Sequence, residues 1–147
     1  MRSKTGWKLI FALTTIGCLS LAYAGDMDNS GHEGDKGYSQ KYVSCMKSAG
    51  HNAISADACM SSELTYQDAR LNKVYKELLD NLKPDSKASL VEAERIWVQL
   101  RAKDGAFDAS LYGSSQSGNA QQLRNDLQRV TQRADLLEGY LELAKLL

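Results

Sequence analysis

Residues Ala58 to Arg101, which form the stretch ACMSSELTYQDARLNKVYKELLDNLKPDSKASLVEAERIWVQLR, contain the pattern from which the fold class follows. It predicts two helices joined by a short turn at Lys83-Pro84-Asp85. Apolar residues recur at steps of three and four, so each helix carries them on one face. On the first helix this face consists of Leu64, Asp68, Leu71, Tyr75, Leu78 and Leu82, and on the second of Leu90, Ala93, Trp97 and Leu100.

Asp68 is the one charged residue on the apolar face of the first helix. A carboxylate there is costly unless it is paired, and Arg101, beside the second stripe, is the expected partner. Glu94 lies seven residues before Arg101 on the same side of the helix, and the two flank Trp97. We expect Asp68, Glu94 and Arg101 to form a structural polar clasp rather than a ligand site, because breaking such a pair when buried costs roughly several kcal/mol. Trp97 is expected in the core.

The N-terminus predicts export. Residues 1–8 carry three basic residues and no acid, residues 9–21 form an apolar run too short to span a bilayer, and Ala22-Tyr23-Ala24 fits an A-x-A cleavage site. Residues 1–24 are therefore interpreted as a signal peptide of a periplasmic or secreted protein. The alternative is a lipoprotein with Cys18 lipidated, for which Gly17 is suitable and Thr15 is unusual.

Removal of this segment changes the charge. Eighteen basic residues less three leaves fifteen, against eighteen acidic ones, so the exported chain is near minus three. The chain lacks the basic stripe of a nucleic-acid-binding protein, and we expect neither nucleic acid nor a membrane span.

Two cysteines, Cys45 and Cys59, remain after cleavage. In a small exported chain such a pair indicates a disulfide, which would close a loop of about 15 residues and contribute roughly 3 kcal/mol. Two free buried thiols are the alternative.

Residues 25–37 are rich in glycine and charge and predict a flexible tail. Within it, His32, Glu33 and Asp35 lack the fixed geometry of a metal site. A short helix over 38–49 follows, ended by Gly50.

Ser55 is then expected to cap the helix that runs to about Leu82, with Asp57 in its first turn. The third helix begins at a cap on Asp85 or Ser86 and its pattern fades near Phe107. A Gly/Ser loop spans 110–119.

The last helix, capped by Asn119, has the most regular seam: Leu123, Leu127, Val130, Ala134, Leu137, Leu141 and Ala144. The chain therefore predicts an all-α fold, a small antiparallel bundle of three to four helices with one disulfide, as a single domain over residues 38–147.

A catalytic set is not evident. His51 lies six residues from Cys45 and eight from Cys59, but oxidation of the cysteines would remove a thiol–imidazole pair. Neighbouring carboxylates on helices are usually solvated. Glycoside hydrolysis instead requires two carboxyl groups that face each other across a substrate cleft. We expect a binding protein, not an enzyme, with no metal and no cofactor.

The two cysteines and two short segments within residues 58–101 match the pattern of a known protein family. The segments are D-x-x-LN-x-x-Y and A-E-x-x-W-x-x-x-R, and with Cys45 and Cys59 they resemble the lysozyme inhibitor LprI-like domain over about residues 42–140. The positions that carry the motif are Glu63, Asn72, Tyr75 and Trp97, together with Asp68, Glu94 and Arg101. The resemblance implies a periplasmic or surface-anchored helical bundle whose best-known relative binds and inhibits lysozyme.

The chain departs from that family at Lys103-Asp104-Gly105, where relatives commonly carry a cysteine, and it also lacks a later one. The resemblance implies that these two form one disulfide, lost together, which leaves Cys45 to pair with Cys59. It also implies a more mobile segment over 105–119.

The leading functional hypothesis is steric inhibition or sequestration of a peptidoglycan-cleaving enzyme such as lysozyme. A possible partner-binding loop is formed by Gly113, Ser114, Ser115, Gln116, Ser117 and Gly118. The alternatives are an immunity protein against a toxin delivered to the periplasm, or a structural component of an envelope complex. An exposed stripe of Leu136, Leu143 and Leu147 would favour the last.

Overall fold

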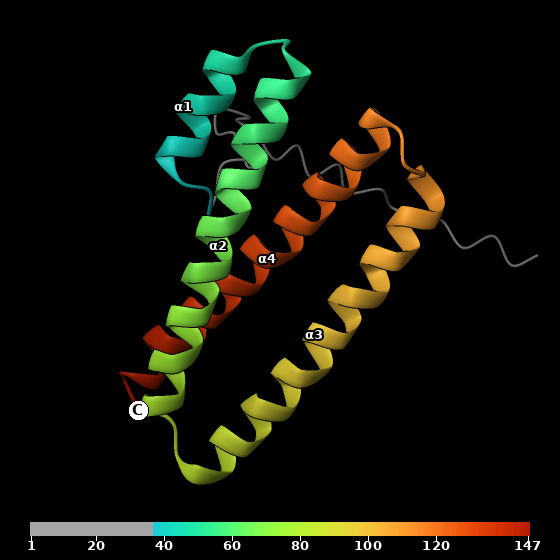
Figure 1. Cartoon of the computed structure of the whole chain (residues 1–147). Coiled ribbons are helices and arrows are strands. Elements are labelled where there is room, and N and C mark those ends of the chain that lie inside the picture. The colour runs from blue at the N-terminus through green and yellow to red at the C-terminus, as the bar shows by residue number, and fades with distance from the viewer. Residues whose placement is uncertain (1–36) are drawn as a thin grey trace, which may run out of the picture. The chain divides into compact units, whose positions relative to one another are not determined.

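The computed structural model describes residues 37–147, and these form four α-helices without a strand. The helices are α1 (Gln40–Ala49), α2 (Ala53–Asn81), α3 (Pro84–Tyr112) and α4 (Gln116–Ala144), as Figure 1 shows. The predicted all-α bundle is thus confirmed. The interpretation of residues 1–24 as a signal peptide lies outside the described residues, as does that of 25–37 as a flexible tail except at Gly37, whose carbonyl is held by Gln67 and Arg70. Within the described part, no helix is both long enough and apolar enough to cross a membrane.

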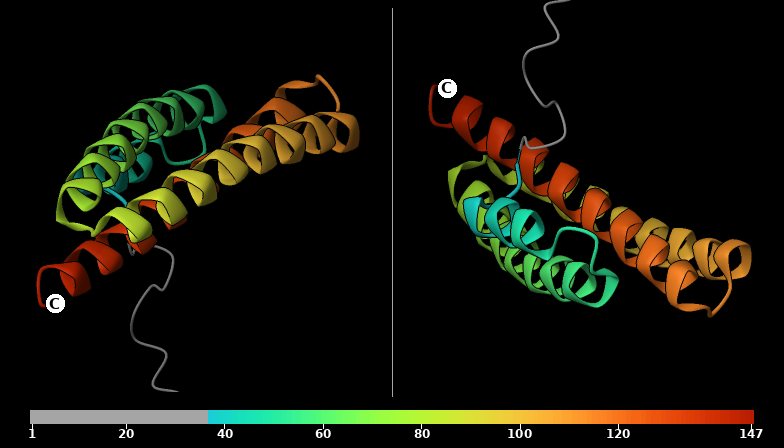
Figure 2. Two further views of the ribbon diagram at one scale, coloured as in Figure 1. Left: turned by 90° about the horizontal axis from the view of Figure 1, so that it is seen from below. Right: turned by 90° about the horizontal axis from the view of Figure 1, so that it is seen from above.

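The last helix, α4, holds the bundle together. Both α2 and α3 pack chiefly on α4, and α1 packs on α2 (Figures 1 and 2). The core is drawn from α2, α3 and α4 and comprises Leu71, Val74, Leu78, Leu90, Val130, Ala134, Leu137 and Leu141. The seam predicted for the last helix is confirmed, since Leu127, Val130, Ala134, Leu137 and Leu141 are all buried.

The helix α3 is much less buried than its sequence pattern predicts. Leu90 and Asp108 are its buried residues, and Trp97 is half-buried against the core. Ala93 and Leu100, expected on the packed face, are exposed, Leu100 to 54%. The reason is that α3 meets α4 along an edge occupied largely by charged side chains, which leaves apolar residues on both flanks.

Two helix starts differ from the predictions. The N-cap of α2 is Asn52, whose Oδ1 accepts from the Ser55 amide at 2.9 Å, so Ser55 is inside the helix and is not its cap. The helix α3 begins at Pro84 rather than after Asp85 or Ser86, with proline at the position where its missing N–H costs nothing.

The loop between α3 and α4 is shorter than predicted. The helix α3 continues past Phe107 to Tyr112, and α4 begins at Gln116 with Ser115 as its N-cap, so Asn119 is not the cap. The helices are therefore joined by Gly113, Ser114 and Ser115, and the expected Gly/Ser loop over 110–119 is wrong over most of its length. The Ser115 hydroxyl accepts from the Gly118 amide at 3.1 Å, because serine readily satisfies a free N–H at a helix start.

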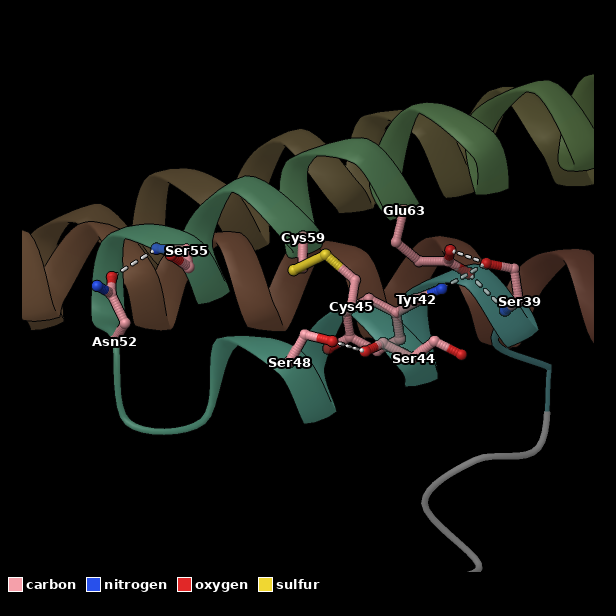
Figure 3. The surroundings of a disulfide bond; sticks show 9 residues. All are labelled: Ser39, Tyr42, Ser44, Cys45, Ser48, Asn52, Ser55, Cys59 and Glu63. Atoms are coloured by element: carbon pink, nitrogen blue, oxygen red, sulfur yellow. Dashed lines mark hydrogen bonds between the residues drawn. A yellow bond between two sulfur atoms is a disulfide. The ribbon is translucent and has the colours of Figure 1, made fainter.

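The disulfide between Cys45 and Cys59 is formed, with the two Cα atoms 5.8 Å apart. It joins the middle of α1 to the first third of α2 (Figure 3). Gly50 ends α1 with a positive φ of 54°, as its sequence position predicts. The short α1 buries no residue fully, so the covalent link contributes much of what holds it to α2.

Candidate functional site

A charged junction connects the three long helices. Arg101 of α3 donates from Nε and Nη2 to the two carboxylate oxygens of Asp126 on α4, each at 2.7 Å, and from Nη1 to Asp68 on α2 at 2.8 Å. The side chains of Arg101, Asp68 and Asp126 are 24%, 40% and 30% exposed. The structure therefore brings together Asp68 and Arg101 of the expected clasp, and Asp126 is a partner that the sequence analysis missed. Hydrogen bonding to Asp126 is the main cause of the raised pKa of Arg101, with Asp68 adding to it.

Glu94, the third member of the expected clasp, belongs to a different pair. Its carboxylate accepts from Nε of Arg133 on α4 at 2.9 and 3.2 Å. Trp97 lies between the two ion pairs, with the guanidinium carbons of Arg101 and Arg133 at 5.8 and 5.7 Å from its ring centroid. The indole is thus held by two cation–π contacts, and including Glu94 in the clasp was wrong because Arg133 lies closer to it than Arg101 does in the α3–α4 interface.

A second shared arginine lies further along the same interface. Arg129 of α4 forms ion pairs with Asp104 at 3.5 Å and with the buried Asp108, both on α3. Its Nη1 is buried without a hydrogen-bond partner among the described residues. Each of Arg101 and Arg129 is shared by two carboxylates, so each cluster has a formal charge of minus one.

A buried polar network, absent from the sequence predictions apart from Glu63, fixes the start of α1. Glu63 accepts from the Ser39 amide at 2.8 Å, from the Ser39 hydroxyl, and from Nε2 of the fully buried Gln67 at 2.7 Å. Figure 3 shows Glu63 facing Ser39, which is also the N-cap of α1. The motif residue Glu63 therefore anchors the N-terminal end of the domain to α2.

This network continues through Arg70 to α4. Arg70 donates to Asp135 at 2.6 Å and to both carboxylate oxygens of Glu138, and its Nη1 donates to the Gly37 carbonyl at 3.1 Å. Gln67 also donates to that carbonyl, at 2.7 Å. The pKa of Arg70 is raised, first by the hydrogen bond to Glu138 and then by Asp135. Glu63, Gln67 and Arg70 are three or four residues apart and therefore share one face of α2. This spacing is the sequence signal from which the polar network could have been predicted.

The remaining motif residues lie beside the junction. Tyr75 packs against the core with Trp97, and the Asn72 side chain donates back to the Asp68 carbonyl at 2.8 Å on the exposed side of α2. These side chains line a shallow hollow between α2 and α3. The motif thus marks the region where α2 and α3 face each other.

The turn expected as a partner-binding loop is partly helical. Gly113, Ser114 and Ser115 form the turn, whereas Gln116, Ser117 and Gly118 belong to the first turn of α4. Gly118 is buried, and a Cβ there would collide with the carbonyl oxygens of Tyr112 and Gly113. The glycine is therefore explained by close packing of the two helix ends, and the exposed tip is the three-residue turn.

Apolar side chains are exposed on the outer side of the α3–α4 pair. On α3 an apolar stripe with helical spacing consists of Ile96, Leu100, Phe107 and Leu111, which we call the outer stripe. Leu136, Tyr140 and Leu143 on α4 are also exposed, as is Leu147 beyond the end of that helix. Exposed apolar residues aligned along one face of a helix, as in the outer stripe, are typical of protein-binding surfaces.

The thiol–imidazole pair and the metal site considered for the sequence can both be checked in the described residues. Both cysteines that could have paired with His51 are joined in the disulfide, so neither offers a thiolate. Over residues 37–147, no group of three His, Cys, Asp or Glu side chains is placed to hold a metal ion.

The family model described as lysozyme inhibitor LprI matches residues 45–137. The chain belongs to the LprI family. The LprI match begins at the first cysteine of the disulfide and includes α2, α3 and most of α4, so it contains the Arg101 junction, Trp97 and Glu63. Neither a curated protein nor a solved structure matches the chain. The LprI family is one of inhibitors rather than catalysts, which indicates a protein that acts through a protein partner.

Proposed function

We propose that this protein is exported and inhibits a peptidoglycan-cleaving enzyme such as lysozyme by covering its active-site cleft. The observation that carries the proposal is the LprI match over residues 45–137. Covering the cleft of an enzyme requires a stable protein surface and no covalent reaction. Export is supported by the pattern of residues 1–24.

The outer stripe is the surface best suited to this contact. Phe107 is 63% exposed and Leu111 59%, and both lie in the last two turns of α3, next to the turn at Gly113. An aromatic ring such as that of Phe107 contributes strongly to the energy of an interface when a partner buries it, and the aliphatic side chain of Leu111 adds apolar area beside it. The end of the α3–α4 pair consists of two helices and a three-residue turn, which is narrow enough to cover or enter a cleft.

The turn at Gly113, Ser114 and Ser115 keeps the tip of the helix pair narrow and is not itself expected to supply binding energy. Gly113 has a φ of 68°, which favours glycine, and the turn carries the small side chains of Ser114 and Ser115. Small residues at the tip allow the flanking Phe107, Leu111 and Tyr112 to reach a partner surface. The binding loop expected at 113–118 is thus replaced by a helix end with a short turn.

A lysis assay tests the proposal. The turbidity of a cell-wall suspension treated with lysozyme is followed with increasing amounts of the purified protein, and we expect slower lysis at stoichiometric amounts. Phe107→Asp and Leu111→Asp should each weaken inhibition about tenfold or more, because they place a charge in the contact.

Ile54→Asp is the matched control, since Ile54 is 74% exposed and lies at the start of α2, on a different helix from the outer stripe. Its inhibition should equal that of the wild type. Unchanged lysis at a large molar excess of wild-type protein would contradict lysozyme as the target.

One observation favours a second candidate function, a structural component of an envelope complex. Leu136 and Leu143 on α4 and Leu147 after its end are exposed, as that hypothesis requires. Solution scattering distinguishes the two, since a structural role through this face predicts self-association that Leu143→Asp abolishes. A monomer at all concentrations would contradict it.

A further inference from the structure

The outer stripe of α3 is an apolar face that the single chain leaves uncovered. Ile96, Leu100, Phe107 and Leu111 are each more than half exposed. At about 100° per residue they fall within about 60° of one another around the helix axis. Ala93, which the sequence pattern predicts on the packed face, is also exposed and falls on this same face. The helix α3 therefore carries one apolar face toward the core and a second one that needs another surface to cover it.

The outer stripe is symmetric about a midpoint at residues 103–104. Leu100 lies as far before this midpoint as Phe107 lies after it, and Ile96 lies as far before it as Leu111 lies after it. When two copies of α3 pack antiparallel about a two-fold axis at the midpoint, Leu100 meets Phe107 of the other copy and Ile96 meets Leu111. Each contact occurs twice, so the stripe is complementary to itself, as a two-fold interface requires.

The helix α4 flanks this contact and does not obstruct it. Glu94, Arg101 and Asp108, which pair with α4, are turned by about 90–130° from the centre of the stripe. Leu100 and Leu136 line the same hollow of about 290 Å³, so one side of α4 borders the stripe. A two-fold axis through the α3 pair places both copies of α4 on the same side of that pair, and the four helices form an antiparallel bundle.

The charges near the midpoint balance within each copy. The Asp104–Arg129–Asp108 cluster, with a formal charge of minus one, lies on the α4 side of the stripe. Lys103 lies on the other side, is exposed, and has no ion-pair partner in the described part of the chain. The axis brings each of these groups near its own counterpart, so charge does not drive the contact and apolar burial must supply its energy.

We infer that the outer stripe binds a second copy of this protein, and that the two copies pair through α3 in antiparallel register about residues 103–104. The contact extends over the fifteen residues from Ile96 to Leu111, which is roughly 22 Å of helix. It differs from self-association through Leu143 on α4. Leu143 lies ten residues past Arg133, the partner of Glu94, and is therefore roughly 15 Å beyond the level at which the stripe ends.

Pairing has a consequence for the proposed inhibition. The paired copies cover Phe107 and Leu111, the residues proposed to contact the enzyme, so the dimer is the resting form and the monomer is the inhibitory form. This consequence rests on the proposed function. The pairing itself does not, because it is measured without any enzyme present.

Analytical ultracentrifugation of the purified protein tests the pairing. We expect a monomer–dimer equilibrium, and Leu100→Asp should raise its dissociation constant about tenfold or more because a charge enters the contact from each copy. Val98→Asp is the matched control, since Val98 is 57% exposed on the opposite side of α3, and it should keep the wild-type constant. Circular dichroism should show the same helix content in all three proteins. A wild-type monomer at all concentrations, or a dimer that Leu143→Asp dissociates and Leu100→Asp does not, would overturn the inference.

Oxidative cross-linking tests the register. A mixture of Leu100→Cys and Phe107→Cys should form a disulfide-linked heterodimer. Each variant alone should not cross-link, because the two copies of one position are separated by seven residues, or roughly 10 Å along the helix. Both variants retain the Cys45–Cys59 disulfide, so the samples of one variant alone also control for exchange with it. Cross-linking of each variant with itself, and none in the mixture, would indicate a parallel pair and contradict the assignment.

Discussion

Arg101 of α3 donates to Asp68 of α2 at 2.8 Å, although the two helices pack chiefly on α4 rather than on each other. The same guanidinium holds Asp126 of α4 through two further hydrogen bonds. One side chain therefore links three helices, and it also makes a cation–π contact with Trp97.

Replacing Arg101 with alanine should destabilise the fold by about 1–2 kcal/mol, measured by urea denaturation. This expected loss of stability lies between the losses typical of exposed and of buried ion pairs. The side chains of Arg101, Asp68 and Asp126 are all partly exposed, so solvent screens their charges. Arg101→Lys should recover little, since an ammonium cannot reproduce the paired contacts to Asp126. The control is Arg95→Ala, which removes a solvent-exposed pair with Glu92 and should leave the free energy of unfolding nearly unchanged. Equal losses for Arg95→Ala and Arg101→Ala would show that the junction has no special role.

Removing the disulfide by Cys45→Ala and Cys59→Ala should lower the free energy of unfolding by about 3 kcal/mol, as for a closed loop of this size. Amide exchange should rise first in α1, which buries no residue fully. The helices α2, α3 and α4 should keep their relative protection, because their core does not include α1. Uniform loss of protection in all four helices would contradict this separation.

The Tyr38 phenol makes the domain sensitive to alkaline pH. Burial raises its pKa above the ordinary 10.0, and the nearby carboxylates of Glu63 and Asp135 raise it further. The folded state thus keeps the proton where the unfolded state loses it, so this contribution to stability is complete below pH 10 and is lost as the pH rises through the folded-state pKa. In urea denaturation from about pH 8 to pH 11, Tyr38→Phe should lose less stability than the wild type. Tyr66→Phe, at an exposed tyrosine of α2, should behave like the wild type.

Replacing Gly105 with alanine should stabilise the isolated protein by about 0.5–1 kcal/mol, because alanine loses less conformational entropy in a helix and the added Cβ meets no described atom. The melting temperature should rise by about 2–5 °C. Gly139→Ala should have a similar effect for the same reason. A fall in melting temperature for Gly105→Ala alone would mean that the backbone at this position needs glycine.

The sequence predicts the long helices and the seam of α4 well, because that helix buries one regular face and the heptad-like spacing is visible without any partner. It predicts α3 poorly. Leu100 fits the same spacing as Leu90 and Trp97 but lies exposed, since α3 carries apolar residues on several sides and spacing alone cannot tell which side meets α4.

The polar contacts were the harder part of the site to predict. Asp68 was identifiable because it interrupts an apolar stripe, and Arg101 was its nearest cationic candidate. The roles of Asp126 and Arg133 depend on the register between α3 and α4, which a single sequence does not specify. Gln67 can be fully buried because its amide donates to the carbonyl of Gly37, thirty residues earlier in the sequence. A contact between residues so far apart in the chain cannot be predicted from a local pattern.

The position of α4 at the end of the chain has a consequence for biogenesis. While residues 116–144 are still inside the ribosome, α2 and α3 lack the surface on which both of them pack. The emerging polypeptide therefore cannot complete its core before the final helix is released, and folding of the three long helices is expected to follow synthesis rather than accompany it.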